Sequence, residues 1–342
     1  MFEEKKSNFV SRDSSPIKKN IMSVYTQSIP SVDLNLFING NAEEKKQFVQ
    51  DLGNAYENIG FVAVKGHLLS DALTGKLYES AKQFFQLPTE TKLKYEIEGM
   101  HGQRGYTSFG KEHAKGREEG DLKEFWHFGQ DLPENSTVNR AEYPANVYVT
   151  EVPEFNIAGM EAYRQLEKTA VYMLRAIALY LGLDEFYFDA KVEHGQSILR
   201  PIHYGPIAGE PKNAVRAAEH EDINLITLLM GASADGLEVL NKQNQWIQVT
   251  ALPEQLVCNV GDMLQRLTNN KLKSTTHRVV NPPRELWNTS RYSIPFFMHP
   301  RSSMSLACLP GCIDAAHPKM YEDFSAGQFL DERLREIGLK GA

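Results

Sequence analysis

Cysteine is scarce in this chain of 342 residues, and the few cysteines suggest neither a disulfide framework nor a zinc motif. The thiols of Cys258, Cys308 and Cys312 are odd in number and lack zinc-type pairing, so we expect a reduced, cytoplasmic setting. A metal pair made by Cys308 and Cys312 stays open as a weak alternative. Long apolar runs are also missing, since no stretch approaches the roughly 18 to 20 apolar residues of a membrane span.

An excess of basic residues is the third absence. The chain has 37 Lys and Arg against 44 Asp and Glu, a formal net charge of -7, whereas nucleic acid or anionic lipid attracts basic surfaces. We therefore expect no nucleic acid and no membrane as partner, and the oligomeric state stays open. With 42% hydrophobic residues, the chain can bury a substantial core without disulfides or a structural metal.

Residues 1–27 are polar and charged and contain no apolar run fit for a signal peptide. We interpret them as a flexible N-terminal tail. Met22 is a second candidate for the biological start of the chain.

Residues 28–153 have the pattern of an α/β cap. A strand is expected at 29–34, a helix at 42–58 and a second strand at 60–64. From residue 101 to residue 153 the chain is rich in glycine, charge and aromatic side chains and shows little periodicity. Segments of this kind often cover active sites.

Residues 154–342 predict a helix followed by a catalytic core of short strands and a C-terminal helix. Apolar residues recur at three or four residue steps from Leu166 to Leu181, before Gly182. Short apolar runs separated by turn residues then indicate a double-sheet jelly roll. The fold class is thus mainly β with an α/β cap, and helices flank the core. The runs are 225–229, 237–240, 246–249, 256–260 and 292–297, and the last helix is expected at 321–339.

His220, Asp222 and His277 form a candidate metal site. In an extended segment His220 and Asp222 point the same way, and the 55 residues between Asp222 and His277 leave room for strands to double back. Two histidines and one carboxylate hold one face of non-haem Fe(II) and leave other positions open. Each histidine then needs a partner on its second ring nitrogen, which the sequence does not identify.

Arg291 and Ser293 share one face of the run that follows, while Tyr292, Ile294 and Phe296 share the other. A buried arginine needs an anion. An arginine with a hydroxyl two residues later offers a fork and one further hydrogen bond, which suits the carboxylate of a ligand.

At these residues the chain resembles the isopenicillin N synthase-like family of Fe(II)/2-oxoglutarate-dependent dioxygenases. The resemblance extends from about residue 28 to about residue 340. The matching segments are 29–34, 60–67, 84–88 with Lys92, 105–106, 121–125, 220–229, 236–239, 260–262, 267–270, 273–280 and 291–297.

The resemblance implies a double-stranded β-helix, Fe(II) bound by His220, Asp222 and His277, and 2-oxoglutarate as co-substrate with O2. Arg291 and Ser293 would hold the distal carboxylate of 2-oxoglutarate, and Tyr204 would also contact this co-substrate. Gly205 stands where the family usually has proline. The implied activity is hydroxylation of an unactivated C–H bond of a small molecule, with release of succinate and CO2.

Two other functions stay open at this point. Isopenicillin N synthase and the aminocyclopropane carboxylate oxidases have the same iron ligands and an Arg-x-Ser but use no 2-oxoglutarate. A protein that binds iron or a ligand without turnover is the third hypothesis. Desaturation or ring closure remains an alternative to hydroxylation.

The residues expected to contact the substrate come from the cap and from the strands around the metal. Arg200 and Arg216 flank the candidate metal-binding strands and are suited to an acidic substrate group, with a surface salt bridge as the alternative role of either one. The full set of candidates is Arg104, Phe109, His113, Trp126, Phe128, Arg200, Arg216 and Phe297.

Overall fold

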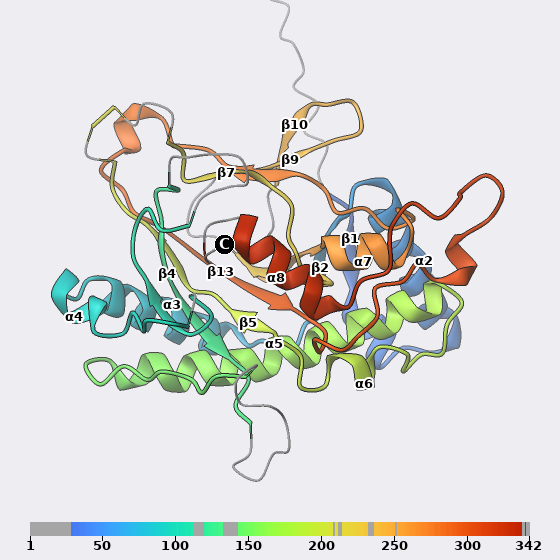
Figure 1. Cartoon of the computed structure of the whole chain (residues 1–342), viewed down its shortest axis with the longest axis horizontal. Coiled ribbons are helices and arrows are strands. Elements are labelled where there is room, and N and C mark those ends of the chain that lie inside the picture. The colour runs from blue at the N-terminus through green and yellow to red at the C-terminus, as the bar shows by residue number, and fades with distance from the viewer. Residues whose placement is uncertain are drawn as a thin grey trace, which may run out of the picture.

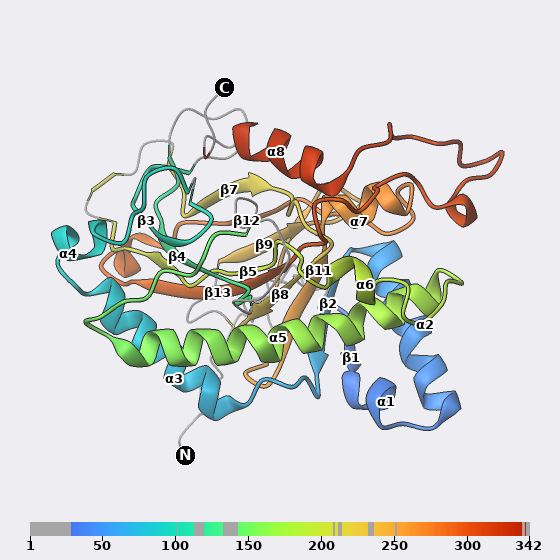
Figure 2. The same ribbon diagram turned by 60° about the horizontal axis from the view of Figure 1, so that its bottom comes forward.

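Two β-sheets face each other and form the centre of the molecule, with long helices packed on one outer side (Figures 1 and 2). This computed structural model describes residues 29–100, 102–112, 120–132, 143–207, 209–210, 214–231, 236–249, 252–336 and 339. The expected N-terminal tail and Met22 lie outside these residues.

The major sheet joins strands from the cap and from the C-terminal half. Its order is β1-β2-β11-β8-β13-β5-β4-β3, and β6 pairs with both β13 and β4. The cap therefore continues the core sheet. The strands are β1 Ser31–Asp33, β2 Phe61–Lys65, β3 Gly105–Thr107, β4 Glu124–Gly129, β5 Ile198–Leu199, β6 Ile202–Tyr204, β8 Ile226–Met230, β11 Leu256–Val260 and β13 Arg291–Met298.

The minor sheet has the order β10-β9-β12-β7 and lies against the inner face of the major sheet. Its strands are antiparallel, and the register of β12 on β7 shifts between His277 and Val279. Such an irregularity increases the local twist and re-aims side chains. The strands are β7 Ala217–His220, β9 Leu237–Leu240, β10 Trp246–Gln248 and β12 His277–Val279.

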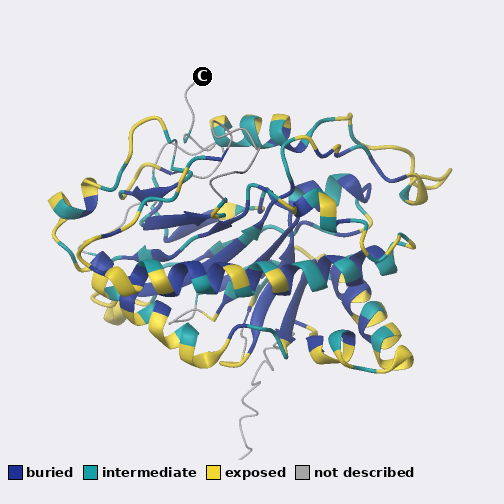
Figure 3. Cartoon of the chain, turned by 90° about the horizontal axis from the view of Figure 1, so that it is seen from below, coloured by how far each residue is buried: buried dark blue, intermediate teal, exposed yellow. Residues whose placement is uncertain are grey.

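Helix α5, Pro153–Tyr180, covers the outer face of the major sheet together with α3, Asp71–Phe85. Figure 3 shows the buried face of α5 turned toward the strands. Its stripe of buried residues includes Leu166, Ala170 and Met173, which packs it into the core. The remaining helices are α1 Leu34–Ile38, α2 Ala42–Asn58, α4 Thr89–Leu93, α6 Asp189–Val192, α7 Asp262–Leu267 and α8 Ala326–Glu336, with 3-10 turns at Arg284–Leu286 and Pro310–Cys312.

The structure agrees with most of the elements expected from the sequence. Helix α2 has the expected limits, and each expected short strand of the C-terminal half is present within one or two residues. Helix α5 extends from the expected apolar stripe back to Pro153 in its first turn, where proline is tolerated. The segment after residue 101 contains β3 and β4, which its sequence did not predict. The C-terminal helix α8 begins at Ala326, later than the expected residue 321.

Within the described part of the chain, no helix combines the length and the apolar character needed to cross a bilayer. The three cysteines are free thiols, and Cys308 donates a hydrogen bond to the carbonyl of Arg266.

Candidate metal centre and substrate cavity

The side chains of His220, Asp222 and His277 converge between the two sheets. His220 ends β7 and stands directly opposite His277 of β12, so that antiparallel pairing brings the two imidazoles together. Their ring centroids are 4.3 Å apart, and Nε2 of His277 is 3.8 Å from Oδ1 of Asp222. One ligand atom from each of the three residues lies within 4.8 Å of the others.

Backbone carbonyls orient both histidines. Nδ1 of His220 lies 2.7 Å from the carbonyl oxygen of Ala218, and Nδ1 of His277 lies 3.0 Å from that of Thr275. A carbonyl oxygen only accepts, so each Nδ1 carries the hydrogen and each Nε2 keeps its lone pair. These carbonyls are the second-nitrogen partners that the metal hypothesis required.

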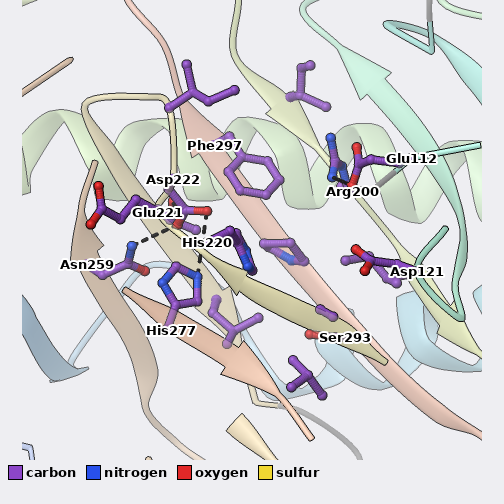
Figure 4. Close-up of a pocket in the computed structure, with 18 of the residues that line it drawn as sticks. Glu112, Asp121, Arg200, His220, Glu221, Asp222, Asn259, His277, Ser293 and Phe297 are labelled. Carbon is purple, nitrogen blue, oxygen red and sulfur yellow. Dashed lines mark hydrogen bonds and ion pairs between the residues drawn. The ribbon is translucent and has the colours of Figure 1, made fainter. Parts of the chain in front are cut away.

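Two neutral donors fix the carboxylate of Asp222. Thr227 and Asn259 donate to Oδ2 at 2.6 and 2.8 Å, from β8 and β11 respectively. Oδ1 is left on the side of the histidines, as Figure 4 shows. The major sheet therefore aims the carboxylate, while the minor sheet supplies the imidazoles.

The site favours a neutral imidazole beside an ionised carboxylate. Burial, together with the neighbouring His277, lowers the pKa of His220 to about 4. Burial alone would raise the pKa of Asp222, but the two histidines and the donors from Asn259 and Thr227 hold it below its usual value. Both groups are thus in the protonation state that binds a metal at neutral pH.

This donor set fits ferrous iron. Two imidazole nitrogens and one carboxylate oxygen on one side leave room for other ligands, whereas a structural zinc site closes four positions and uses more sulfur. Among the described residues, no other group of at least three histidine, cysteine or acidic side chains is close enough to hold a metal.

Arg291, Ser293 and Tyr204 meet at another part of the same space. Arg291 is opposite Tyr204 in the antiparallel pairing of β13 with β6, and its guanidinium carbon lies 5.0 Å from the centre of the Tyr204 ring. All three side chains are buried and line the cavity. Strand alternation places Tyr292 and Ile294 in the hydrophobic core on the opposite face, as the sequence predicted.

A cavity of about 420 Å³ connects the metal ligands with Arg291 and Ser293. Phe297 follows Ser293 on the same face of β13. Its ring lines the cavity between the candidate metal ligands and Arg200 at the far side (Figure 4). Helix α8 covers the cavity with Leu330 and Leu334. Pockets for small ligands are commonly enclosed in this way and are about 300 to 1,000 Å³ in size.

The far side of the cavity is formed by Arg200 and three residues that the sequence analysis did not propose as site residues. These are Glu112, Asp121 and Lys123, which come from the segment around β4 and are buried. Burial alone would raise the pKa of Glu112, but Arg200 and Lys123 hold it well below its usual range. Asp121 and Lys123 lie in a segment that resembled the family, but no spacing rule linked them to Arg200.

Trp126 and Phe128 do not line this cavity, which corrects their assignment as substrate contacts. They alternate along β4 with Phe125 and His127 and therefore face the helices. Both are completely buried in the core, where Trp126 packs against Phe84 at 5.0 Å between ring centroids. Their aromatic character reflects packing.

Three further substrate candidates also lie away from the cavity. Arg216 is buried and donates to the carbonyl of Thr289 at 3.0 Å, at the start of β13. Arg104 is buried against Gly129, where a β-carbon would lie 1.8 Å from its guanidinium carbon. Phe109 is 47% exposed and lines a separate hollow beside His203. His113 lies outside the described residues. Arg200 and Phe297 are therefore the substrate candidates that the cavity retains.

Known families match both halves of the chain. Residues 29–151 match the family described as "non-haem dioxygenase in morphine synthesis N-terminal", and residues 196–300 match the "2OG-Fe(II) oxygenase superfamily". The 2-oxoglutarate-Fe(II) type oxidoreductase hxnY of Emericella nidulans is 30% identical over 303 residues, which cover 85% of each chain. This chain belongs to the 2-oxoglutarate- and Fe(II)-dependent oxygenases.

Solved structures of this oxygenase family have the same architecture. A protein of Caulobacter crescentus assigned to the 2OG-Fe(II) oxygenase family is 43% identical, with a TM-score of 0.80 over 90% of this chain and 99% of that one. A full-length Neurospora crassa protein, solved in complex with alpha-KG and thymine, is 29% identical, with a TM-score of 0.78 over 90% of this chain and 96% of that one. The oxygenase described here is thus a 2-oxoglutarate-dependent dioxygenase with Fe(II) as its metal and a jelly-roll core.

Proposed function

We propose that His220, Asp222 and His277 bind the Fe(II) of this oxygenase. The convergence of their three ligand atoms within 4.8 Å is the observation that carries the assignment. The fixed tautomers of both histidines and the two hydrogen bonds to Asp222 support it, because they remove the need to reorder the side chains when the metal binds.

Arg291 and Ser293 are proposed to hold the distal carboxylate of 2-oxoglutarate, and Tyr204 to pack beside it. The guanidinium offers a planar fork, and the hydroxyl adds one further donor on the same strand face. Tyr204 limits the movement of Arg291 from the neighbouring strand. This arrangement positions the co-substrate and adds selectivity for a ligand with a second carboxylate.

Bound Fe(II) and 2-oxoglutarate supply the oxidation of a C–H bond by O2, with succinate and CO2 as the other products. The residues of the chain bind, orient and exclude water around that chemistry. Phe297 lines the space beside the metal ligands, and α8 covers it, so that a bound substrate is shielded from solvent. We propose hydroxylation of an unactivated C–H bond of a small molecule.

The size of the cavity supports a small substrate. About 420 Å³ must accept both 2-oxoglutarate and the substrate. The Neurospora crassa protein, whose fold this chain resembles, has been solved with thymine, a molecule of suitable size. Arg200 and Phe297 are the proposed substrate contacts, because both line the cavity, Phe297 beside the proposed metal ligands and Arg200 at the far side.

The proposed division of labour follows the two parts of the chain. Residues 28–153 form the cap, which supplies Glu112, Asp121 and Lys123 to the cavity. Residues 154–342 supply the metal ligands and the co-substrate residues. A cytoplasmic location is proposed from the three free thiols, which a reducing compartment maintains.

A compound screen for substrate-dependent succinate release tests the proposed function. The Fe(II)-loaded enzyme should form succinate in step with hydroxylated product. Product formed without 2-oxoglutarate would instead indicate an oxidase of the isopenicillin N synthase type. A protein that binds Fe(II) but consumes no 2-oxoglutarate with any compound would support the non-catalytic alternative.

A further inference from the structure

The far side of the cavity contains four charged side chains whose formal charges cancel. This charge cluster consists of Glu112, Asp121, Lys123 and Arg200. Nζ of Lys123 lies 2.7 Å from Oε1 of Glu112 and 2.7 Å from Oδ2 of Asp121. Nη1 of Arg200 lies 3.2 Å from the same Oε1. Each cation therefore already has a carboxylate partner.

The charge cluster still has hydrogen-bonding capacity. Both cations use Oε1 of Glu112, and its Oε2 is buried without a hydrogen-bond partner in the described part of the chain. Arg200 donates from Nε to His127 and from Nη1 to Glu112, which leaves Nη2 without a hydrogen bond to any described residue. An acceptor and a donor thus lie on neighbouring side chains. A buried carboxylate oxygen without a partner costs stability, and a ligand that donates to it recovers that cost.

The guanidinium of Arg200 is held in place on several sides. Its central carbon lies 4.4 Å from the Phe125 ring centre and 5.1 Å from that of Phe297. The ring of His127 accepts from Nε, because its Nδ1 is turned to the carbonyl of Gly102. Burial and the charge of Arg200 keep the pKa of His127 well below its usual value, so His127 adds no charge. Arg200 is therefore not free to leave Glu112 for an incoming anion.

Two further charged side chains on the cavity wall, Arg333 and Glu219, are paired as well. Arg333 of α8 lies 2.8 Å from Glu336, and Glu219 lies 3.2 Å from Arg278. Arg291 is assigned to the co-substrate. An anionic substrate group would lose its hydration beside a cluster of zero net charge, and burial without a new partner is costly.

We propose that the substrate presents a neutral group with adjacent hydrogen-bond acceptor and donor atoms to the charge cluster, as an amide, a lactam or a urea does, rather than a carboxylate or a phosphate. This inference rests on the proposed function for its substrate site. It replaces the expectation that Arg200 pairs an acidic group. The acceptor atom of the ligand would meet Arg200, and its N–H would meet Glu112.

Matched ligand pairs test the proposal directly. Calorimetric titration of the anaerobic Fe(II)- and 2-oxoglutarate-loaded enzyme would compare δ-valerolactam with pentanoate, and benzamide with benzoate. The neutral member of each pair should bind at least about tenfold more tightly, because sites built for hydrogen bonding discriminate strongly. Tighter binding of the carboxylates, or no binding of either neutral compound, would overturn the proposal.

Glu112→Gln changes the charge of the cluster with little change in shape. It leaves Arg200 without its carboxylate, so the ratio of carboxylate affinity to amide affinity should rise by about tenfold or more. Glu185→Gln is the matched control. It removes a carboxylate that forms an ion pair with Lys45 at 2.9 Å outside the cavity, so it should leave the affinity ratio unchanged. An unchanged ratio in Glu112→Gln would contradict the proposal.

Arg200→Gln provides the second test if Glu112→Gln does not fold. Removal of the guanidinium should weaken amide binding by about tenfold and should not create affinity for carboxylates. Improved carboxylate binding in this variant would overturn the proposal.

Repeating the titrations on the metal-free protein separates this proposal from the proposed function. If Fe(II) or 2-oxoglutarate does not bind, the function fails, whereas a preserved preference for the neutral ligands keeps the charge-cluster proposal. If both bind and the preference is absent, only the charge-cluster proposal fails.

Discussion

The two ends of the cavity reach their geometry by different means. At the metal end, His220 and His277 are cross-strand partners, and backbone carbonyls fix their rings. At the far end, Arg200 is fixed by side chains from the segment around β4. Backbone pairing makes the positions of the two imidazoles insensitive to most neighbouring side chains, whereas each charge at the second end depends on the others. Our proposals therefore assign the chemistry common to the family to paired strands, and substrate selection to a wall of mutually dependent side chains.

The largest expected effect is at the metal end. Asp222→Ala removes one of the three proposed metal ligands, and its loss should abolish Fe(II)-dependent succinate formation. Bound iron and succinate would be measured after anaerobic loading. Asp184→Ala, on an exposed turn, is the control and should behave like the wild type. Full activity in Asp222→Ala would refute the ligand assignment.

Arg291→Leu should raise the concentration of 2-oxoglutarate needed for half-maximal rate by about 100-fold, since the proposed charge-assisted contact with the distal carboxylate is lost. The rate at saturating 2-oxoglutarate should change less. Arg164→Leu, on the exposed face of α5, serves as the matched control. An unchanged 2-oxoglutarate requirement would remove Arg291 from the co-substrate site.

Thr227→Val sharpens the comparison, because it tests how far the metal end depends on a supporting side chain. The hydroxyl of Thr227 donates to Oδ2 of Asp222 at 2.6 Å, and its loss should lower Fe(II) affinity by about 10- to 100-fold. Thr268→Val removes a buried hydroxyl that donates to the carbonyl of Leu264 and accepts from the backbone N–H of Leu272 but does not contact Asp222, so it should leave affinity unchanged. Equal affinities in both variants would show that the backbone alone positions the site.

A smaller effect is expected on the stability of the metal-free protein when the pH falls. Burial lowers the pKa of His299, on the cavity wall, to about 4, below its unfolded value near 6.5. The unfolded chain then binds the proton more readily, so stability is lost between those two values as pH decreases. From pH 7 to pH 5 this loss is about 2 kcal/mol.

Denaturant unfolding at both pH values would measure this loss. His299→Gln should reduce the pH dependence by that amount, whereas His317→Gln, at an exposed position, should not. An identical pH dependence in His299→Gln and the wild type would contradict the buried neutral state of His299.

The sequence predicted that His220, Asp222 and His277 converge, because its signals are local or periodic. His220 and Asp222 are two residues apart, and Arg291 with Ser293 repeats that spacing beside an apolar alternation, which the structure confirms on β13. The strands of the core were predicted from apolar runs between turn residues in the same way.

The far end could not be predicted, because it depends on contacts between distant segments. Arg200 meets Glu112 across 88 positions and His127 across 73. The face of β4 also decided which aromatic residues reach the cavity. Because this segment was not predicted as a strand, the sequence did not show that successive side chains of β4 point to opposite faces. Trp126 and Phe128 were therefore assigned to the cavity, although they face the hydrophobic core.

Anaerobic titration of the metal-free protein with Fe(II), with 2-oxoglutarate present and with His277→Ala in parallel, tests the central claim most directly. We predict one tightly bound Fe(II) per chain in the wild type, visible as the absorption of the iron and 2-oxoglutarate complex, and loss of that complex in His277→Ala. Absence of stoichiometric binding in the wild type, or an unchanged complex in the variant, would contradict the claim that these two strands and Asp222 form the iron site.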